Sequence, residues 1–427
     1  MIISPNTNYN LKGKEYLKEY ILENKLKLIY KHTESELTSI CISIDAGAGV
    51  ETDKYGVAHA TEHMVYKGTK YRTEKEINKD LSNIFGFNNA MTNFPYVIYY
   101  GTLLGEDLNK GVELLSDIII NPSFNDEGFK EEMDVIKEEL KEWDEELEQY
   151  CEDKLFFNSF ENRRIKYPII GTEESLENMT LNDIRAFYSK YYFPENTSIV
   201  IISSAKFEEA KDIVEGYFKI WKNNIIDNKY IYEIKDKKIE YEVPEACTFD
   251  DKRDGVKTCK IQIICPIDNL SNKEMKSLRI FNQYFGEGIN SILYDTLRTK
   301  NGLIYDIITK IANENYIKLY KITFSTAKEN VDKSINLVKK CIEELELLNQ
   351  QIEVNEIEQL IKSFKLKRLF REEQSIVLAK ELATYDTMYT DYKRYIDENN
   401  ELDVLTKEMI FEVGSKVLKN LTIQIIY

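Results

Sequence analysis

The sequence predicts an α+β protein with two domains of similar make-up. Three observations support this prediction. Stretches with strand patterns alternate with stretches of helical periodicity in both halves of the chain. A polar segment separates the two halves. The length of 427 residues is enough for more than one hydrophobic core.

The first half contains four stretches that are rich in β-branched and aromatic residues and bounded by glycine or polar residues. These predicted strands lie within residues 26–32, 38–49, 87–104 and 197–205. Helical periodicity is expected over residues 57–66, 128–150 and 180–191. Together these elements predict a first domain over residues 1–225.

The second half repeats this pattern after the polar segment. Residues 226–245, which include the run IKDKKIEYE, form the predicted linker. Beyond it, the run KIQIICPI from Lys260 predicts a strand, a helix is expected from Lys273, and long helices are expected from there to the C-terminus. These elements predict a second domain over residues 246–427.

The composition excludes several classes of protein. A formal net charge of −17 argues against nucleic acid as a partner, because binding to a phosphate backbone needs clustered lysine and arginine. The six cysteines are scattered without a CxxC pair, so neither a disulfide framework nor a thiolate zinc site is expected. No stretch is apolar enough for a membrane span or for the core of a signal peptide. We therefore expect a cytoplasmic protein that does not bind membranes.

The strongest chemical signal is a pair of histidines. The chain has only three histidines, and two of them, His59 and His63, flank Glu62 in an HxxEH pattern. Residues four apart share one helical face, so the two imidazoles can bind a single metal ion. Glu62 precedes the second imidazole and can reach a water on that ion. Because the rest of this helix is apolar, its polar stripe is expected to line a cavity.

A third metal ligand must come from elsewhere in the chain. A catalytic zinc ion typically takes three protein ligands and a water. No histidine follows His63, so a carboxylate is expected, and the predicted helix over residues 128–150 holds many. On a helical wheel, Glu132 and Glu139 lie at the edge of the apolar stripe, and Glu146 is a reserve candidate. A charged carboxylate at the edge of an apolar stripe is partly removed from water, and a nearby cation stabilises it.

The chain resembles the insulinase/pitrilysin family of zinc metallopeptidases, the inverted zincins, and especially its short form, which includes the mitochondrial processing peptidase subunits. The segment GVAHATEHMVYKGT from Gly56 is similar to the family's HxxEH helix, and VIKEE from Val135 is similar to its ligand helix. Further similar motifs extend the resemblance over nearly the whole chain: NNAMT (88–92), PIIGTE (168–173), YYFPEN (191–196) and LRTKNGLIY (297–305). One departure is the pair Ser203 and Ser204, where the family usually has glycine.

The resemblance implies a specific metal site. One zinc ion per chain would be held by His59, His63 and Glu139, with Glu132 as an auxiliary acidic residue of the catalytic site. Glu62 would act as the general base that takes a proton from water during peptide-bond hydrolysis.

The resemblance also implies residues that bind the substrate. Arg298 and Tyr305 would contact the peptide and stabilise the developing oxyanion. Asn89 and Ala90 would lie in an edge strand to which the peptide adds by β-pairing.

The implied architecture is two domains, each a mainly antiparallel sheet packed with helices, that form half of a clamshell chamber. Since one chain carries both the zinc motif and the Arg/Tyr motif, a homodimer is expected. The implied function is an endopeptidase for short or unfolded peptides. Two alternatives are a catalytic subunit of a heterodimeric processing peptidase dedicated to one precursor peptide, paired with a homologous subunit, and an inactive binding subunit. The complete HxxEH pattern argues against the inactive alternative.

Overall fold

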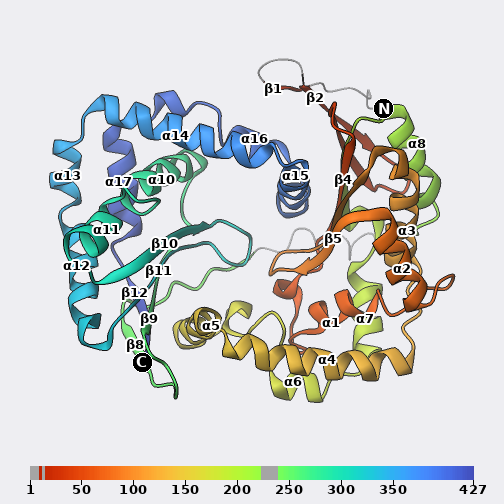
Figure 1. The fold of residues 1–427 in the computed structure, drawn as a ribbon, viewed down its shortest axis with the longest axis horizontal. Helices are drawn as coiled ribbons and strands as arrows, with labels where there is room; N and C mark the ends of the chain where they lie inside the picture. The colour runs from red at the N-terminus through yellow and green to blue at the C-terminus, as the bar shows by residue number, and fades with distance from the viewer. Residues whose placement is uncertain (1–8, 12–14, 223–238) are drawn as a thin grey trace. The chain divides into compact units, whose positions relative to one another are not determined.

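The structure is a computed structural model, and it describes residues 9–11, 15–222 and 239–427. The chain forms two compact units, and each is built on one β-sheet with helices packed against it (Figure 1). Unit 1 comprises the described parts of residues 1–140, 168–238 and 371–396. Unit 2 comprises the described parts of residues 141–167, 239–370 and 397–427.

Unit 1 contains a seven-stranded sheet. Its strands lie in the spatial order β1 (Tyr9–Leu11), β2 (Glu15–Ile21), β3 (Lys27–His32), β7 (Thr197–Ser203), β4 (Leu37–Ile44), β6 (Val97–Leu104) and β5 (Phe85–Thr92). All neighbours are antiparallel except the parallel pair β3 and β7. The strand β5 therefore forms one edge of the sheet.

Helices cover both faces of this sheet. The helices of unit 1 are α1 (Val57–Met64), α2 (Glu74–Ile84), α3 (Leu108–Ile120), most of α4 (Asp126–Glu145), α6 (Glu173–Glu177), α7 (Leu181–Tyr191), α8 (Phe207–Phe218), α15 (Ser375–Tyr389) and nearly all of α16 (Lys393–Asp397). Helix α15 packs on β4 and β7, whereas α3 and α8 pack on the opposite face (Figure 1). Every residue of β7 is buried for this reason, which explains its unbroken apolar run.

Unit 2 contains a five-stranded sheet. Its strands lie in the order β10 (Ile304–Ala312), β11 (Leu319–Thr326), β9 (Cys259–Pro266), β12 (Thr422–Ile426) and β8 (Thr248–Asp251). Only the pair β12 and β8 is parallel. Its helices are α5 (Leu147–Ser159), α10 (Asn272–Phe285), α11 (Ile292–Tyr294), α12 (Val331–Glu343), α13 (Leu345–Gln351), most of α14 (Val354–Glu372) and α17 (Lys407–Val417).

The alternation of side chains along β9 places the core of unit 2. Ile261 and Ile263 face the main apolar cluster, which α10, α12 and α17 complete. Gln262 faces the other side, where its Nε2 donates to the carbonyl oxygen of Glu148 on α5 at 3.0 Å. Helix α5 thus covers the second face of the sheet.

The predicted α+β class with two mainly antiparallel sheets is confirmed, but three predicted elements differ from the structure. The stretch 87–104 is not one strand but the hairpin of β5 and β6, which turns at residues 93–96. The helix predicted over 128–150 is two helices, because Glu146 leaves the helical conformation at ψ 103°. The chain ends on the strand β12 rather than on a helix, since this strand completes the pairing of β9 and β8.

The boundaries of the two units also differ from those of the predicted domains, which are two consecutive segments of the chain. Residues 141–167 belong to unit 2 because α5 packs on β9 and β12, and residues 371–396 belong to unit 1 because α15 packs on β4 and β7. Most of the predicted linker, residues 226–238, lies outside the described residues.

Two further observations concern the environment of the protein. Within the described ranges, none of the helices combines the length and the apolar character that a membrane crossing requires. All six cysteines are free thiols, and five of them are buried.

Candidate metal centre

Helix α1 begins at a tight turn that requires glycine. The residue before the helix is Gly56 at φ 89°, and a Cβ there would lie 2.4 Å from the carbonyl oxygen of Ile170. Glu51 closes the turn, because its Oε1 accepts from the N–H of Ala58 at 2.8 Å and its Oε2 from the N–H of Gly56 at 3.1 Å. A carboxylate here satisfies open N–H groups and interacts favourably with the helix dipole. The first turn of α1 is therefore fixed in place.

His59 and His63 lie one turn apart on α1 with their Nε2 atoms close together. The two Nε2 atoms are 3.2 Å apart, and the ring planes meet at 62°. Two nitrogen ligands that each lie about 2.0–2.1 Å from a tetrahedral zinc ion are themselves about 3.3 Å apart. The spacing of the two imidazoles matches that requirement.

Glu139 on α4 brings a carboxylate to the same point. Its Oε1 lies 3.8 Å from Nε2 of His59, and its Oε2 lies 3.6 Å from Nε2 of His63. Within the part of the chain that the structure describes, these three residues form the only group of His, Cys, Asp or Glu side chains spaced to hold a metal ion. Two imidazoles and one carboxylate are a ligand set that catalytic zinc takes in proteins. The residues present therefore fit zinc.

Glu132 contacts His63 from the other side. Its Oε1 lies 2.7 Å from Nδ1 of His63. When Nδ1 donates its hydrogen to this carboxylate, the lone pair of Nε2 points toward His59 and Glu139, and such partners orient metal ligands in many sites. Glu132 is thus placed behind a ligand rather than among the ligand atoms. Glu146, the reserve candidate, precedes α5 in unit 2 and takes no part in this cluster.

The two histidines have different protonation behaviour. Burial, and then the neighbouring His63, lower the pKa of His59 to about 3, so this ring is neutral at pH 7. Its Nδ1 is buried and has no hydrogen-bond partner among the described residues, so packing orients the ring. Burial acts to lower the pKa of His63, but the hydrogen bond with Glu132 and the nearby carboxylates raise it above its ordinary value. A cation at the cluster would replace the proton that these carboxylates attract.

Glu62 is a buried carboxylate held by the neighbouring strand. It is 8% exposed, and the hydroxyl of Thr92 at the end of β5 donates to its Oε2. Burial raises the pKa of Glu62, although the hydrogen bond from Thr92 opposes this shift. A carboxylate with a raised pKa is suited to accept and return a proton near neutral pH.

Asn89 and Ala90 lie on β5, as the resemblance implies, and β5 is an edge strand. Among the described residues, no strand pairs with its outer side. Asn89 is exposed and Ala90 is half-buried. An open strand edge next to Thr92 and Glu62 can accept an extended peptide by main-chain hydrogen bonds.

Arg298 and Tyr305 lie together on unit 2. Arg298 belongs to a π-helical turn, η5 (Asp295–Lys300), and Tyr305 to β10, one of the two edge strands of the second sheet. The guanidinium carbon of Arg298 lies 5.1 Å from the ring centroid of Tyr305, and Tyr305 is 83% exposed. The pair forms an exposed cationic and hydroxyl-bearing surface of this unit.

Sequence reasoning missed three residues that support the cluster: Glu51, Thr92 and Lys67. The signal for Glu51 was an acidic residue shortly before the glycine that opens α1. Thr92 lies within the NNAMT segment, but its bond to Glu62 depends on how β5 packs on α1. Lys67 lies one turn after His63 and contacts Glu132.

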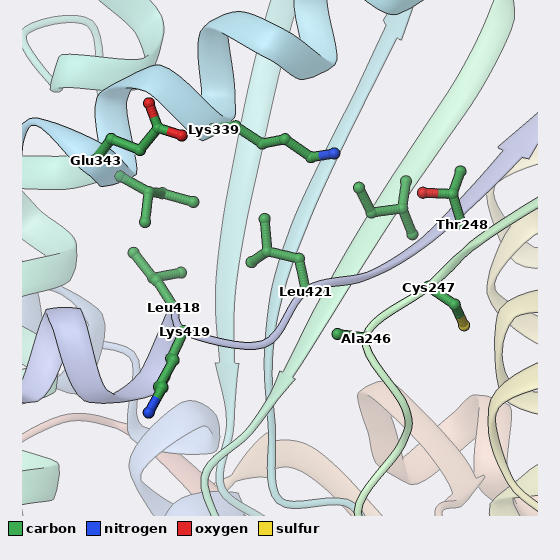
Figure 2. Close-up of a pocket in the computed structure, with 10 residues that line it drawn as sticks. Ala246, Cys247, Thr248, Lys339, Glu343, Leu418, Lys419 and Leu421 are labelled. Atoms are coloured by element: carbon green, nitrogen blue, oxygen red, sulfur yellow. The ribbon is translucent and has the colours of Figure 1, made fainter.

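A separate hollow lies in unit 2. It has a volume of about 340 Å³ and is lined by segments next to β8, β12 and α12 (Figure 2). Its lining includes no histidine and one carboxylate, Glu343. Burial raises the pKa of its thiol, Cys247, which disfavours the nucleophilic thiolate. The lining of this hollow therefore lacks the combination of imidazoles and a carboxylate that His59, His63 and Glu139 form in unit 1.

Comparison with protein families gives two matches that cover most of the chain. Residues 27–173 match the family described as "Insulinase (Peptidase family M16)", and residues 178–364 match "Peptidase M16 inactive domain". The first match contains the complete cluster of His59, His63 and Glu139. The second contains Arg298 and Tyr305.

Individual relatives agree with these matches. The "uncharacterized zinc protease YmxG" of Bacillus subtilis is 27% identical over 297 residues, which cover 68% of this chain and 69% of that protein. The mitochondrial-processing peptidase subunit beta of Blastocladiella emersonii is 30% identical over 181 residues, 42% of this chain and 39% of that protein. The crystal structure of a protease from Helicobacter pylori has the same fold, with a TM-score of 0.82 at 20% identity over 97% of this chain and 100% of that one.

Proposed function

This chain belongs to the insulinase family of peptidases, family M16, and we propose that it is a zinc-dependent endopeptidase. The relatives named zinc proteases support this class of reaction. The observation that carries the proposal is the meeting of His59, His63 and Glu139 within ligand distance of one point. We propose that these three side chains hold one zinc ion per chain.

The chain's own residues supply the remaining steps of hydrolysis. When bound, zinc acts as a Lewis acid that activates water and polarises the scissile carbonyl group. Glu62 accepts the proton from the attacking water and passes it to the leaving amine. Thr92 holds Glu62 through its hydroxyl, and Glu132 holds His63 through Nδ1. Glu132 is therefore proposed as a positioning residue of the catalytic site.

The proposed substrates are short or unfolded peptides. An edge strand can pair only with a segment that is itself extended, and β5 presents Asn89 and Ala90 on such an edge. We propose that Arg298 and Tyr305 bind the substrate peptide and stabilise the oxyanion that develops on its carbonyl group. Their exposure on unit 2 leaves them open to a substrate.

The proposed assembly is a homodimer, because one chain carries the zinc motif and the Arg/Tyr motif together. A second candidate is a catalytic subunit that works with a homologous partner, which the relatives named subunit beta of a processing peptidase favour. The description "inactive domain" applies to residues 178–364 and not to the helices that carry the metal cluster. We also propose a cytoplasmic location, which the six free cysteines support.

The test of this function compares Glu62→Gln with the wild-type protein. We expect the variant to bind zinc as the wild type does and to hydrolyse a library of unstructured fluorogenic peptides about 10²–10⁴-fold more slowly. Glu138→Gln, which changes an exposed carboxylate beside Glu139, is the matched control and should retain activity. Full activity of Glu62→Gln would contradict the proposed mechanism. Activity of wild-type protein only after addition of a homologous partner would favour the second candidate.

A further inference from the structure

We propose that Lys67 is a positioning residue of the metal centre. In this inference, its ammonium group holds Glu132 in the orientation in which that carboxylate binds His63, and it thereby sets the affinity of the cluster for zinc. The inference rests on the proposed function and deepens it, because it names a residue that controls the metal site without touching the metal.

Lys67 lies where three segments of unit 1 meet. It follows α1, its side chain is only 10% exposed, and its Nζ lies 3.3 Å from Oε2 of Glu132 on α4. The same Nζ lies 2.9 Å from Oε2 of Glu74 at the start of α2 and 3.4 Å from Oε2 of Glu131. One ammonium group therefore balances three carboxylates, and only Glu132 among them contacts a proposed metal ligand.

The backbone around Lys67 is fixed to the segment that leads into α4. The carbonyl oxygen of Lys67 accepts from Nδ2 of Asn125 at 3.2 Å. The next carbonyl oxygen, that of Gly68, accepts from the N–H of Ser123 at 3.0 Å. Gly68 has φ 121°, a conformation that residues with a side chain rarely adopt, so the turn requires glycine here. Lys67 is thus held in a defined place relative to the helix that carries Glu132.

The two oxygens of Glu132 have different partners. Oε1 binds Nδ1 of His63 at 2.7 Å, and Oε2 faces Nζ of Lys67. The terminal torsion of a glutamate is soft, so a carboxylate with a single partner can rotate, whereas two partners on opposite oxygens fix its plane. The imidazole of His63 takes its orientation from that plane. His59 has no equivalent support, because its Nδ1 lacks a hydrogen-bond partner among the described residues.

The test measures zinc affinity and the geometry of the site rather than activity alone. Apo protein is titrated with zinc against a competing chelator, and the cobalt(II) form is examined by its visible absorption spectrum. Substitution of a residue that orients a metal ligand typically weakens metal binding about 10–100-fold, and we expect Lys67→Met to weaken zinc binding at least about tenfold and to alter the cobalt spectrum. Lys67→Arg, which keeps the cation, should restore both within about threefold.

Glu74→Gln is the matched control. It removes another partner of the same lysine but leaves Glu132 and His63 unchanged, so zinc affinity and the cobalt spectrum should equal those of the wild type. A purely structural role for Lys67 would lower the melting temperature of the Lys67 variant while zinc binding stays at the wild-type level, and this result would overturn the inference. If Lys67→Met does not fold, Lys67→Gln replaces it with the same expectation. If the wild-type protein binds no zinc, the proposed function and this inference both fail. If the wild type binds zinc but the Lys67 variants bind it equally well, only this inference fails.

Discussion

The hydroxyl of Thr92 donates its hydrogen to the buried carboxylate of Glu62. This bond joins the end of β5, the edge strand proposed to bind the peptide, to the helix that carries the proposed general base. The position of Glu62 is therefore coupled to the position of the strand that receives the substrate.

Thr92→Val removes this donor while it keeps the shape of the side chain. A buried carboxylate that loses a hydrogen bond destabilises the folded state, so we expect the free energy of unfolding at pH 7 to fall by about 1–3 kcal/mol. Thr92→Ser keeps the hydroxyl and should recover most of this loss. Urea denaturation of the three proteins checks the expectation. Equal stabilities of the valine variant and the wild type would show that the bond contributes nothing.

Gly56→Ala tests the turn that opens α1. The new Cβ would meet the carbonyl oxygen of Ile170 at 2.4 Å, and φ 89° is strained for alanine, so a loss of at least about 2 kcal/mol is expected. Gly216→Ala on α8 is the control, because a Cβ there has no atom within 4 Å and alanine favours a helix by up to about 1 kcal/mol. Thermal denaturation should lower the melting temperature of the first variant only. A similar response of both variants would contradict the proposed role of the turn.

Arg298→Ala and Tyr305→Phe test the proposed substrate surface on unit 2. Loss of one group that stabilises an oxyanion lowers turnover about 10²–10³-fold, and we expect losses of this size in kcat with unchanged zinc content. Lys310→Ala, which changes another exposed residue of β10, should remain active. Steady-state kinetics with a fluorogenic peptide and zinc analysis measure both quantities. Wild-type kcat in both variants would remove these residues from the mechanism.

The raised pKa of Asp153 on α5 can be tested through the pH dependence of stability. Trp143 and Gln149 donate to its carboxylate at 2.8 and 2.9 Å, but burial raises its pKa to about 6. Since this pKa lies above the unfolded value of about 3.9, the folded state binds the proton more tightly. Its contribution to stability is therefore complete below about pH 4 and is lost as the pH rises through about 6.

Asp153→Asn removes this titration. The free energy of unfolding of the variant, measured relative to that of the wild type, should rise by up to about 3 kcal/mol between pH 4 and pH 7. Urea denaturation at several pH values gives this difference. A difference that stays constant with pH would contradict the raised pKa.

The local patterns of the sequence were sufficient to predict the two histidines on one helix face. The i,i+4 spacing requires only that residues 57–64 are helical, and they are. The helical wheel narrowed the third ligand to a few glutamates, and the family resemblance selected Glu139. The different positions of Glu132 and Glu139 could not be read from the wheel, because they depend on how α4 packs against α1.

Long-range packing explains what the sequence did not predict. The exchange of residues 141–167 and 371–396 between the two units follows from which sheet each helix covers, and helical periodicity alone does not specify a partner sheet. The turn between β5 and β6 was missed although Pro95 marks a break in the strand pattern, because aromatic and apolar residues lie on both sides of it. The support that Lys67 gives to the cluster likewise depends on a long-range contact with Glu132 on α4, whereas Glu51 binds N–H groups close to it in the sequence.

Anomalous diffraction at the zinc edge, from crystals of the wild-type protein grown with zinc, tests the central claim most directly. We predict one strong anomalous peak per chain. It should mark a zinc ion that lies about 2.0–2.2 Å from Nε2 of His59, Nε2 of His63 and the carboxylate of Glu139. A peak bound by other residues, or none near the two imidazoles at saturating zinc, would contradict the proposed metal centre.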